Sequence, residues 1–397
     1  MSWLGIEGHD EIAARFQRAI TQKRFASTFL FLGPAGIGKR MFAERLAMTL
    51  QCERTEPERM EPCGKCASCR QILDRTHPDL IFVSKPEDRA FIPIDAFIGP
   101  KEARHQLGLC SELVKKPVYG RRKMAIIDDA DYLNQEGANA MLKTLEEPPK
   151  NSVLILIGTS AARQLPTIRS RCQIVRFTPL ETETVERILR EKRAEQVALA
   201  ESVSETLAKK KRAPSIKKTT KGILDESLIP QLAAYSGGSV QEALALAEEG
   251  FWEFRSRFLK RLVFGVRERQ TFMAEIEAQL ESVGKVPALR RARLRVIMET
   301  ASDFFRRLAL WLSGTTPTDP RLAAEWRPLL ESAAAAWPFD AEGAANAALR
   351  SADYLELLQR NVHQPTLLDA WTDELIRIYG GDSTALGIAS WALVPNP

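Results

Sequence analysis

The chain has 397 residues, of which 45% are hydrophobic and 27% charged, and this length and composition indicate a globular protein of two or three domains. No apolar run approaches the ~20 residues that span a bilayer, and the amino terminus lacks a basic leader followed by an apolar core, so we expect a cytoplasmic protein. The net charge of +5 permits contact with nucleic acid without requiring it.

A phosphate-binding loop follows the first predicted strand, residues 28–32. Residues 33–39 match the first seven positions of the pattern G-x-x-x-x-G-K-[ST], in which backbone N–H groups surround the phosphates and the lysine, here Lys39, reaches the outer ones. The eighth position normally supplies a hydroxyl ligand for Mg²⁺, but it is Arg40, which has no acceptor to offer a cation. The two glycines of the pattern are Gly33 and Gly38, and Gly36 is a third glycine of the loop.

Four cysteines cluster after the helix predicted from Met41 to Leu50. Their spacing, C-x₁₀-C-x₂-C-x₂-C, allows four thiolates to converge tetrahedrally on one Zn²⁺, and four sulfur ligands leave no open position for a reactive water. We therefore predict a structural zinc site, against the alternative of four unligated thiols. The predicted ligands are Cys52, Cys63, Cys66 and Cys69, whereas Cys110 and Cys172 are expected to be small buried apolar residues.

Five short apolar runs predict a parallel β-sheet covered by helices on both faces, because they are separated by segments of helix length. Ligands bind to such sheets at the carboxyl ends of the strands, so we expect the nucleotide-site residues there. The predicted strands are residues 28–32, 80–83, 124–127, 153–157 and 173–177.

Two aspartates follow the third predicted strand. Asp128 fits the place of the carboxylate that holds Mg²⁺ opposite a phosphate loop, although a lone Asp-Asp pair would otherwise indicate a turn. Asp129 stands where related ATPases carry the glutamate that polarises the attacking water, and its side chain is one methylene shorter. The fourth strand ends at two polar residues, Thr159 and Ser160.

Beyond residue 179 the pattern is helical. The basic run 209–221 is either a nucleic-acid-binding arm or a solvated insertion, and the lack of interleaved aromatic residues favours the insertion. Helix resumes at residues 227–249, with a break at Gly237-Gly238, and a buried apolar stripe is predicted within 289–312. The sequence predicts three domains. The first is 1–178, with a zinc module at about 51–70. The second is a small helical domain at 179–250, with a basic flexible insertion at about 201–223, and the third is a helical domain at 251–397.

Two further motifs lie at residues 142–149, Leu-Lys-Thr-Leu-Glu-Glu-Pro-Pro, and at 165–172, Leu-Pro-Thr-Ile-Arg-Ser-Arg-Cys. With them the chain resembles the clamp-loader branch of the AAA+ ATPases, by motif over residues 1 to about 250 and by length and helical character beyond. The resemblance implies a P-loop α/β domain with an inserted zinc module, a small helical lid and an all-α collar. It also implies that Arg171 is an arginine finger for ATP on a neighbouring subunit, against the alternative of a structural ion pair. Either Thr159 or Ser160 matches the family's first sensor, a polar group near the terminal phosphate.

The resemblance implies a second departure in the nucleotide pocket. The family's second sensor is an arginine, but Gln241 occupies that position in Gly-Ser-Val-Gln-Glu-Ala-Leu. With Arg40 and Asp129 this predicts a pocket with weak or no ATPase activity, in which bound ATP, ADP or Mg²⁺ is doubtful. The Arg40 guanidinium could occupy the Mg²⁺ position and pair with Asp128, or it could extend into solvent.

The function implied by the resemblance is that of a clamp-loader subunit that completes a neighbour's ATP site. Its implied partners are gamma or tau ATPase subunits, the delta subunit, the sliding clamp and primer–template DNA. Two alternatives remain: an active ATPase motor like gamma or tau, and a pure scaffold with a vestigial nucleotide fold. The retained Ser-Arg-Cys sequence argues against the scaffold.

Overall fold

A computed structural model describes residues 3, 5–86, 89, 91–119, 121–209, 223–248, 250–315, 320–359 and 362–387. The chain divides into two compact units, Met1–Ile188 with Gly237–Gln241, and Leu189–Ser236 with Glu242–Pro397. The boundaries of the three domains expected from the sequence stay a prediction. None of the described helices is long and apolar enough to cross a bilayer.

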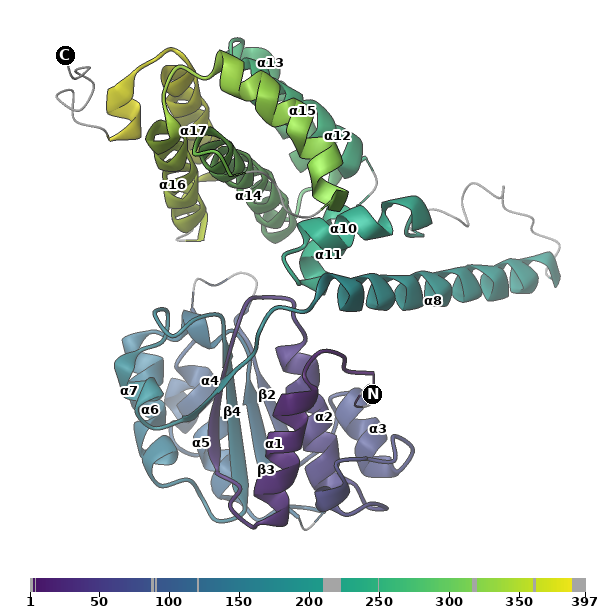
Figure 1. Ribbon diagram of the computed structural model, residues 1–397. Coiled ribbons are helices and arrows are strands. Elements are labelled where there is room, and N and C mark those ends of the chain that lie inside the picture. Colours follow the sequence, from purple (N-terminus) through teal and green to yellow (C-terminus); the bar gives the residue numbers. More distant parts are fainter. Residues whose placement is uncertain are drawn as a thin grey trace. The chain divides into compact units, whose positions relative to one another are not determined.

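The first unit contains a parallel five-stranded sheet in the order β2-β3-β4-β1-β5 (Figure 1). The predicted fold class is confirmed, and each predicted strand forms within one residue of its expected bounds. β1, β3 and β4 are buried along their whole length, as their continuous apolar sequences require. The strands are β1 Thr28–Leu32, β2 Leu80–Val83, β3 Lys123–Ile127, β4 Ser152–Gly158 and β5 Gln173–Arg176.

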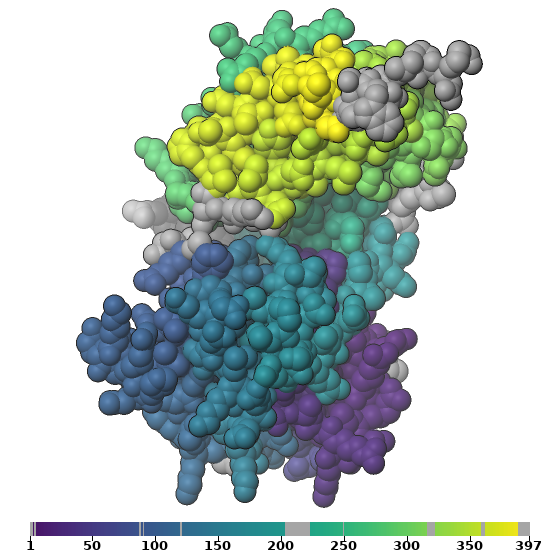
Figure 2. Space-filling model, turned by 90° about the vertical axis from the view of Figure 1, so that its left-hand side faces the viewer, coloured from purple at the N-terminus to yellow at the C-terminus, as the bar shows by residue number. Residues whose placement is uncertain are grey.

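Helices cover both faces of this sheet, and alternate residues of each strand point to opposite faces. Phe31 of β1 joins the core formed with α1 Asp10–Thr21, α2 Lys39–Gln51 and α3 Ala67–Leu73. Leu30 joins the core on the other face of the sheet. The helices that cover this face lie in the part of the surface coloured blue and teal in Figure 2. The helices there are α4 Asp95–Ile98, α5 Leu109–Val114, α6 Gln135–Glu146 and α7 Pro166–Arg169.

Short 3₁₀ turns connect several of these elements. They are η1 Pro57–Arg59, η2 Lys101–Ala103 and η3 Ala130–Tyr132 in the first unit, and η4 Glu226–Leu228 and η5 Ser383–Leu386 in the second. The turn η3 matters for function because it directly follows the aspartate pair at the end of β3.

The second unit is helical throughout its described residues, as the sequence predicts. The first helix leading into it, α8 Thr182–Lys209, continues past the predicted end at residue 200, and the basic residues at 210–221 lie outside the described residues. The predicted stripe of α14 is buried from Leu294 to Leu308, while Trp311 is half-buried. The remaining helices are α10 Ile229–Tyr235, α11 Val240–Leu246, α12 Phe251–Phe264, α13 Arg269–Ser282, α14 Pro287–Leu312, α15 Pro320–Ala336, α16 Ala341–Gln359 and α17 Gln364–Tyr379.

Candidate functional site

The candidate nucleotide pocket lies at the carboxyl ends of three neighbouring strands. β1 leads into the phosphate loop, β3 ends just before Asp128, and β4, which lies between them, ends just before Thr159 and Ser160. Because the strands are parallel, these three ends meet at one edge of the sheet. The fold therefore gathers there the residues that the sequence analysis assigned to nucleotide binding from separate parts of the chain.

The phosphate loop is closed on itself through its lysine. Gly36 and Gly38 have φ values of 74° and 96°, which favour glycine and allow the tight turn before α2. The buried Lys39 Nζ donates hydrogen bonds to the Gly33 carbonyl, at 2.7 Å, and to the Pro34 carbonyl. Burial lowers the pKa of Lys39 to about 8, against the opposing attraction of Asp128 and Asp131. Its ammonium lies where it could instead meet a phosphate.

Arg40 points to the carboxylate that would hold the metal ion. Its Nη1 lies 3.4 Å from Asp128 Oδ2, and its Nε lies 3.4 Å from Glu44 Oε1 one helical turn further along α2. The guanidinium also stacks on the ring of Phe82, 4.6 Å from the ring centroid. The sequence left two arrangements open for the Arg40 side chain, pairing with Asp128 or extending into solvent. In the structure its guanidinium pairs with Asp128. These residues do not fit Mg²⁺, because a fixed cation takes the place of the metal's hydroxyl ligand.

Asp129 and Asp131 differ in what they contact. Asp129 has a φ of 57°, and burial together with the neighbouring Asp128 raises the pKa of its carboxyl. Asp131 accepts a hydrogen bond from the Thr159 hydroxyl at 2.6 Å and another from the Thr159 N–H at 3.0 Å. It also accepts one from the Gln164 amide.

Of the two sensor candidates, Thr159 therefore has its hydroxyl directed at a carboxylate within the chain. The sequence analysis missed Asp131 as the residue that fixes this end of β4. Its signal was a third aspartate just after the Asp128-Asp129 pair.

The segment that carries the predicted second sensor lies against the phosphate loop. The Val240 N–H donates to the Gly36 carbonyl at 3.2 Å. A Cβ placed on Gly36 would come within 2.3 Å of Ser239 Oγ and 2.4 Å of Gln241 Cβ. Gln241 thus touches the loop, but its amide brings no positive charge to the pocket.

Arg171 lies at the opposite edge of the sheet from the phosphate loop. Its carbonyl accepts a hydrogen bond from the Thr28 hydroxyl at 2.9 Å, and Thr28 begins β1, whereas the loop follows the end of β1. A strand of this length spans ~13 Å, which separates Arg171 from the chain's own pocket. Its guanidinium bonds to Glu146, with Nε 2.7 Å from Oε1, and to the Thr167 carbonyl at 3.0 Å.

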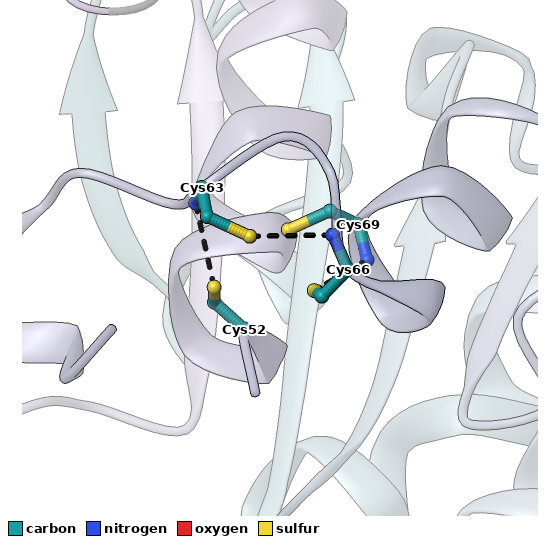
Figure 3. A group of neighbouring side chains, drawn as sticks. All are labelled: Cys52, Cys63, Cys66 and Cys69. Carbon is teal, nitrogen blue, oxygen red and sulfur yellow. Dashed lines mark hydrogen bonds between the residues drawn. The ribbon is translucent and has the colours of Figure 1, made fainter. Parts of the chain in front are cut away.

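The four predicted zinc ligands form one cluster at the end of α2 and the start of α3 (Figure 3). Their sulfur atoms all lie within 4.8 Å of one another. Small side-chain shifts would bring all four to the distance of about 2.3 Å from a central zinc ion that a tetrahedral site requires. The site could therefore hold zinc. Cys52, Cys66 and Cys69 are buried and Cys63 is half-buried.

Backbone N–H groups favour the thiolate forms that bind metal. The N–H groups of Cys63, Cys66 and Cys69 point to the sulfurs of Cys52, Cys63 and Cys66 at 3.3–3.4 Å. Burial opposes ionisation of Cys52, yet the N–H of Cys63 and the segment 54–55 lower its pKa to about 6. Burial raises the pKa of Cys69, which therefore depends most on a metal ion for its ionisation.

A buried polar network joins the cysteine cluster to the sheet. Ser68, between two of the cysteines, has its Oγ 2.9 Å from His77 Nε2, and the Asp79 N–H donates to His77 Nδ1. The fully buried Asp79 carboxylate accepts from the N–H groups of Val118 and Tyr119 and pairs with Lys123 at 3.1 Å. Because Nδ1 accepts from the Asp79 N–H, His77 carries its proton on Nε2 and donates it to the Ser68 hydroxyl. Ser68, His77 and Asp79 therefore have a structural role, and His77 does not activate the serine as a base.

Cys110 and Cys172 depart from the expectation of full burial. Both are half-buried at the margin of the second core, and burial raises the pKa of each thiol, that of Cys172 to about 12. Neither belongs to the cysteine cluster.

Comparisons with known proteins find relatives of this chain among the subunits of DNA polymerase III. Residues 8–181 match the family model described as DNA polymerase III, delta subunit. The chain is 40% identical over 147 residues to DNA polymerase III subunit delta' of Pseudomonas aeruginosa, covering 37% of this chain and 42% of that protein. It is 34% identical over 168 residues to subunit delta' of Bacillus subtilis, covering 42% and 47%.

A third relative belongs to another type of subunit. DNA polymerase III subunit tau of Bacillus subtilis is 30% identical over 245 residues, covering 61% of this chain and 40% of that protein. The chain thus matches less than half the length of each of these relatives. The expected resemblance is confirmed over part of the chain: residues 8–181 match the model described as DNA polymerase III, delta subunit, and the chain is similar to delta' subunits over less than half of its length.

Proposed function

We propose that this protein is a delta-prime-like subunit of a bacterial DNA polymerase III clamp loader and helps to load the sliding clamp on primed DNA. Its proposed partners are the gamma or tau and delta subunits, the sliding clamp and primer–template DNA within the assembled ring, in the cytoplasm. Support comes from the family match over residues 8–181 and from the delta' relatives.

The proposed contribution of the chain to ATP hydrolysis is made in trans by Arg171. The observation that carries this proposal is the position of Arg171 at the edge of the sheet away from the chain's own phosphate loop. A guanidinium there can reach only a phosphate bound to another subunit, where it would spread positive charge over the transferring phosphoryl oxygens.

The chain's own pocket is proposed to have lost hydrolysis. Three departures support this: the Arg40–Asp128 contact in place of a metal ligand, the short Asp129, and the neutral Gln241 against the loop. The zinc proposed at the four cysteines is structural, since four thiolates fill its coordination shell and leave no position for a reactive water.

The test is to reconstitute the ring with Arg171→Ala and measure DNA-stimulated ATP hydrolysis. Loss of one finger should lower hydrolysis at the adjoining site by ~10³-fold or more. Arg169→Ala, two residues earlier on α7, is the matched control and should leave the rate within about twofold. An Arg171→Ala ring that hydrolyses ATP at the parent rate would refute the assignment.

A motor subunit of the gamma or tau type is the second candidate, favoured by the tau relative and by Lys39 and Asp128 at the phosphate loop. It requires that the purified chain hydrolyse ATP alone. Measuring hydrolysis by the isolated chain separates the two, because the delta-prime proposal expects no turnover above background.

A further inference from the structure

The Arg40 guanidinium occupies a built site at the start of α2. Asp128 and Glu44 supply carboxylate oxygens 3.4 Å from its Nη1 and Nε, and the face of Phe82 supports its plane. The position of each contact is set by a different element, namely the end of β3, the next turn of α2 and β2. A side chain held from three directions is pre-organised and needs little further ordering when a ligand arrives.

The loop therefore presents two neighbouring fixed cations, Lys39 and Arg40, beside backbone N–H groups at the start of α2. A phosphate loop ordinarily offers one lysine and relies on Mg²⁺ for the second positive centre. A divalent ion next to a guanidinium would be repelled, and Asp128 already has a cationic partner. Lys39 and Arg40 are thus the two cations that the chain itself can offer a polyphosphate, although both lie near carboxylates.

A buried histidine packs against the same loop. His9 is only 3% exposed, and its Nε2 is bonded to the Ile37 carbonyl of the loop at 2.7 Å. Its buried Nδ1 has no hydrogen-bond partner among the described residues. Because Nε2 donates to the Ile37 carbonyl, Nδ1 is an acceptor, so its partner would be a donor such as water and not a phosphate oxygen.

We propose that this phosphate loop binds a nucleoside di- or triphosphate without Mg²⁺, with the Arg40 guanidinium taking the place of the metal ion. The inference rests on the proposal that this pocket does not hydrolyse ATP. The Lys39 ammonium leaves the Gly33 and Pro34 carbonyls for the phosphates, and Arg40 donates from its fixed position. The absence of a metal and the short Asp129 then leave the nucleotide intact.

The experiment measures the binding of ATP and ADP to the purified full-length chain by calorimetry, in EDTA and in excess Mg²⁺. The parent chain should bind with dissociation constants that agree within about threefold in the two buffers. Arg40→Thr restores the hydroxyl of the motif, so it should bind at least about tenfold tighter in Mg²⁺ than in EDTA.

Arg75→Thr is the matched control. Arg75 also stacks on Phe82, at 4.7 Å, and also bonds to Glu44, at 3.0 Å, but its recorded ion pair does not involve Asp128. The Arg75→Thr variant should therefore bind ATP and ADP with the same affinity in EDTA as in excess Mg²⁺. A parent chain that gains tenfold from Mg²⁺, or that binds neither nucleotide in either buffer, overturns the inference. The ring assay with Arg171→Ala is unaffected by that result, so the two proposals fail separately.

Discussion

The guanidinium of Arg171 is bonded to Glu146 of the same chain, with Nε 2.7 Å from Oε1. Glu146 ends α6 within the motif Leu-Glu-Glu-Pro-Pro, and Arg171 is in Ser-Arg-Cys after α7, so the two motifs that suggested a clamp-loader protein meet in one ion pair. A finger that acts on a neighbour's ATP must exchange this carboxylate for a phosphate. If Arg171 is such a finger, Glu146 competes with the phosphate for its guanidinium.

Removing the negative charge of Glu146 should make Arg171 easier to recruit. The pair is partly exposed, so its contribution is about 1 kcal/mol, and Glu146→Gln should lower the apparent KM for ATP in the reconstituted ring by up to roughly fivefold with little change in kcat. Glu147→Gln is the control for charge in the same motif. A loss of kcat comparable to that of Arg171→Ala would show instead that Glu146 aims the finger.

Zinc removal should unfold the cysteine module. Metal analysis of the purified chain should find about one zinc per chain, and Cys69→Ser should abolish it, because a serine hydroxyl cannot replace the fourth thiolate of the cluster. We expect increased protease sensitivity around residues 52–73 in the variant. Cys110→Ser, outside the cluster, should retain the metal; zinc loss there would argue against the four-cysteine site.

Asp79→Asn should be among the more damaging single substitutions in the first unit. It leaves the buried Lys123 ammonium without its carboxylate, a loss of about 3–5 kcal/mol in the free energy of unfolding. The exposed Asp95, which lies 3.9 Å from Arg104, offers a control, and Asp95→Asn should cost under about 0.5 kcal/mol in urea denaturation.

The same residue gives the stability a defined pH dependence. Although burial alone would raise the pKa of Asp79, the N–H groups of Tyr119 and Val118 and the Lys123 ammonium hold it below its usual value. A depressed carboxyl pKa supplies stability that is complete above the ordinary carboxyl pKa and is lost as pH falls through the folded-state pKa. Asp79→Asn should therefore weaken the acid dependence of unfolding below about pH 4. A variant whose stability falls with decreasing pH as steeply as that of the parent chain would contradict this role of Asp79.

Gly36→Ala should separate backbone strain from steric contact at the phosphate loop. Both Gly36 and Gly237 have positive φ, 74° and 57°, so an alanine at either costs ~1–2 kcal/mol. At Gly36 the new methyl also meets Ser239 and Gln241, whereas at Gly237 nothing lies within 4 Å. Gly36→Ala should therefore destabilise the first unit more than Gly237→Ala in thermal unfolding, and equal shifts would mean that the loop does not contact that segment.

The sequence by itself determined the sheet and the chemistry of its edge. Continuous apolar runs such as Val153–Ile157 are buried on both faces only in a parallel sheet, and the phosphate-loop and cysteine spacings each specify their ligands locally. Helix ends were less predictable, since α8 continues into polar residues where no apolar pattern distinguishes helix from solvated chain.

What only the tertiary structure decided were contacts between residues far apart in the chain. Whether Arg40 meets Asp128 or solvent, whether Thr159 faces Asp131, and which carboxylate holds Arg171 depend on strand order and on how helices pack across it. Periodicity and motif spacing describe one segment at a time, whereas a hydrogen bond or ion pair needs two segments placed within a few ångströms. That placement also set Arg171 and the phosphate loop at opposite edges of one sheet.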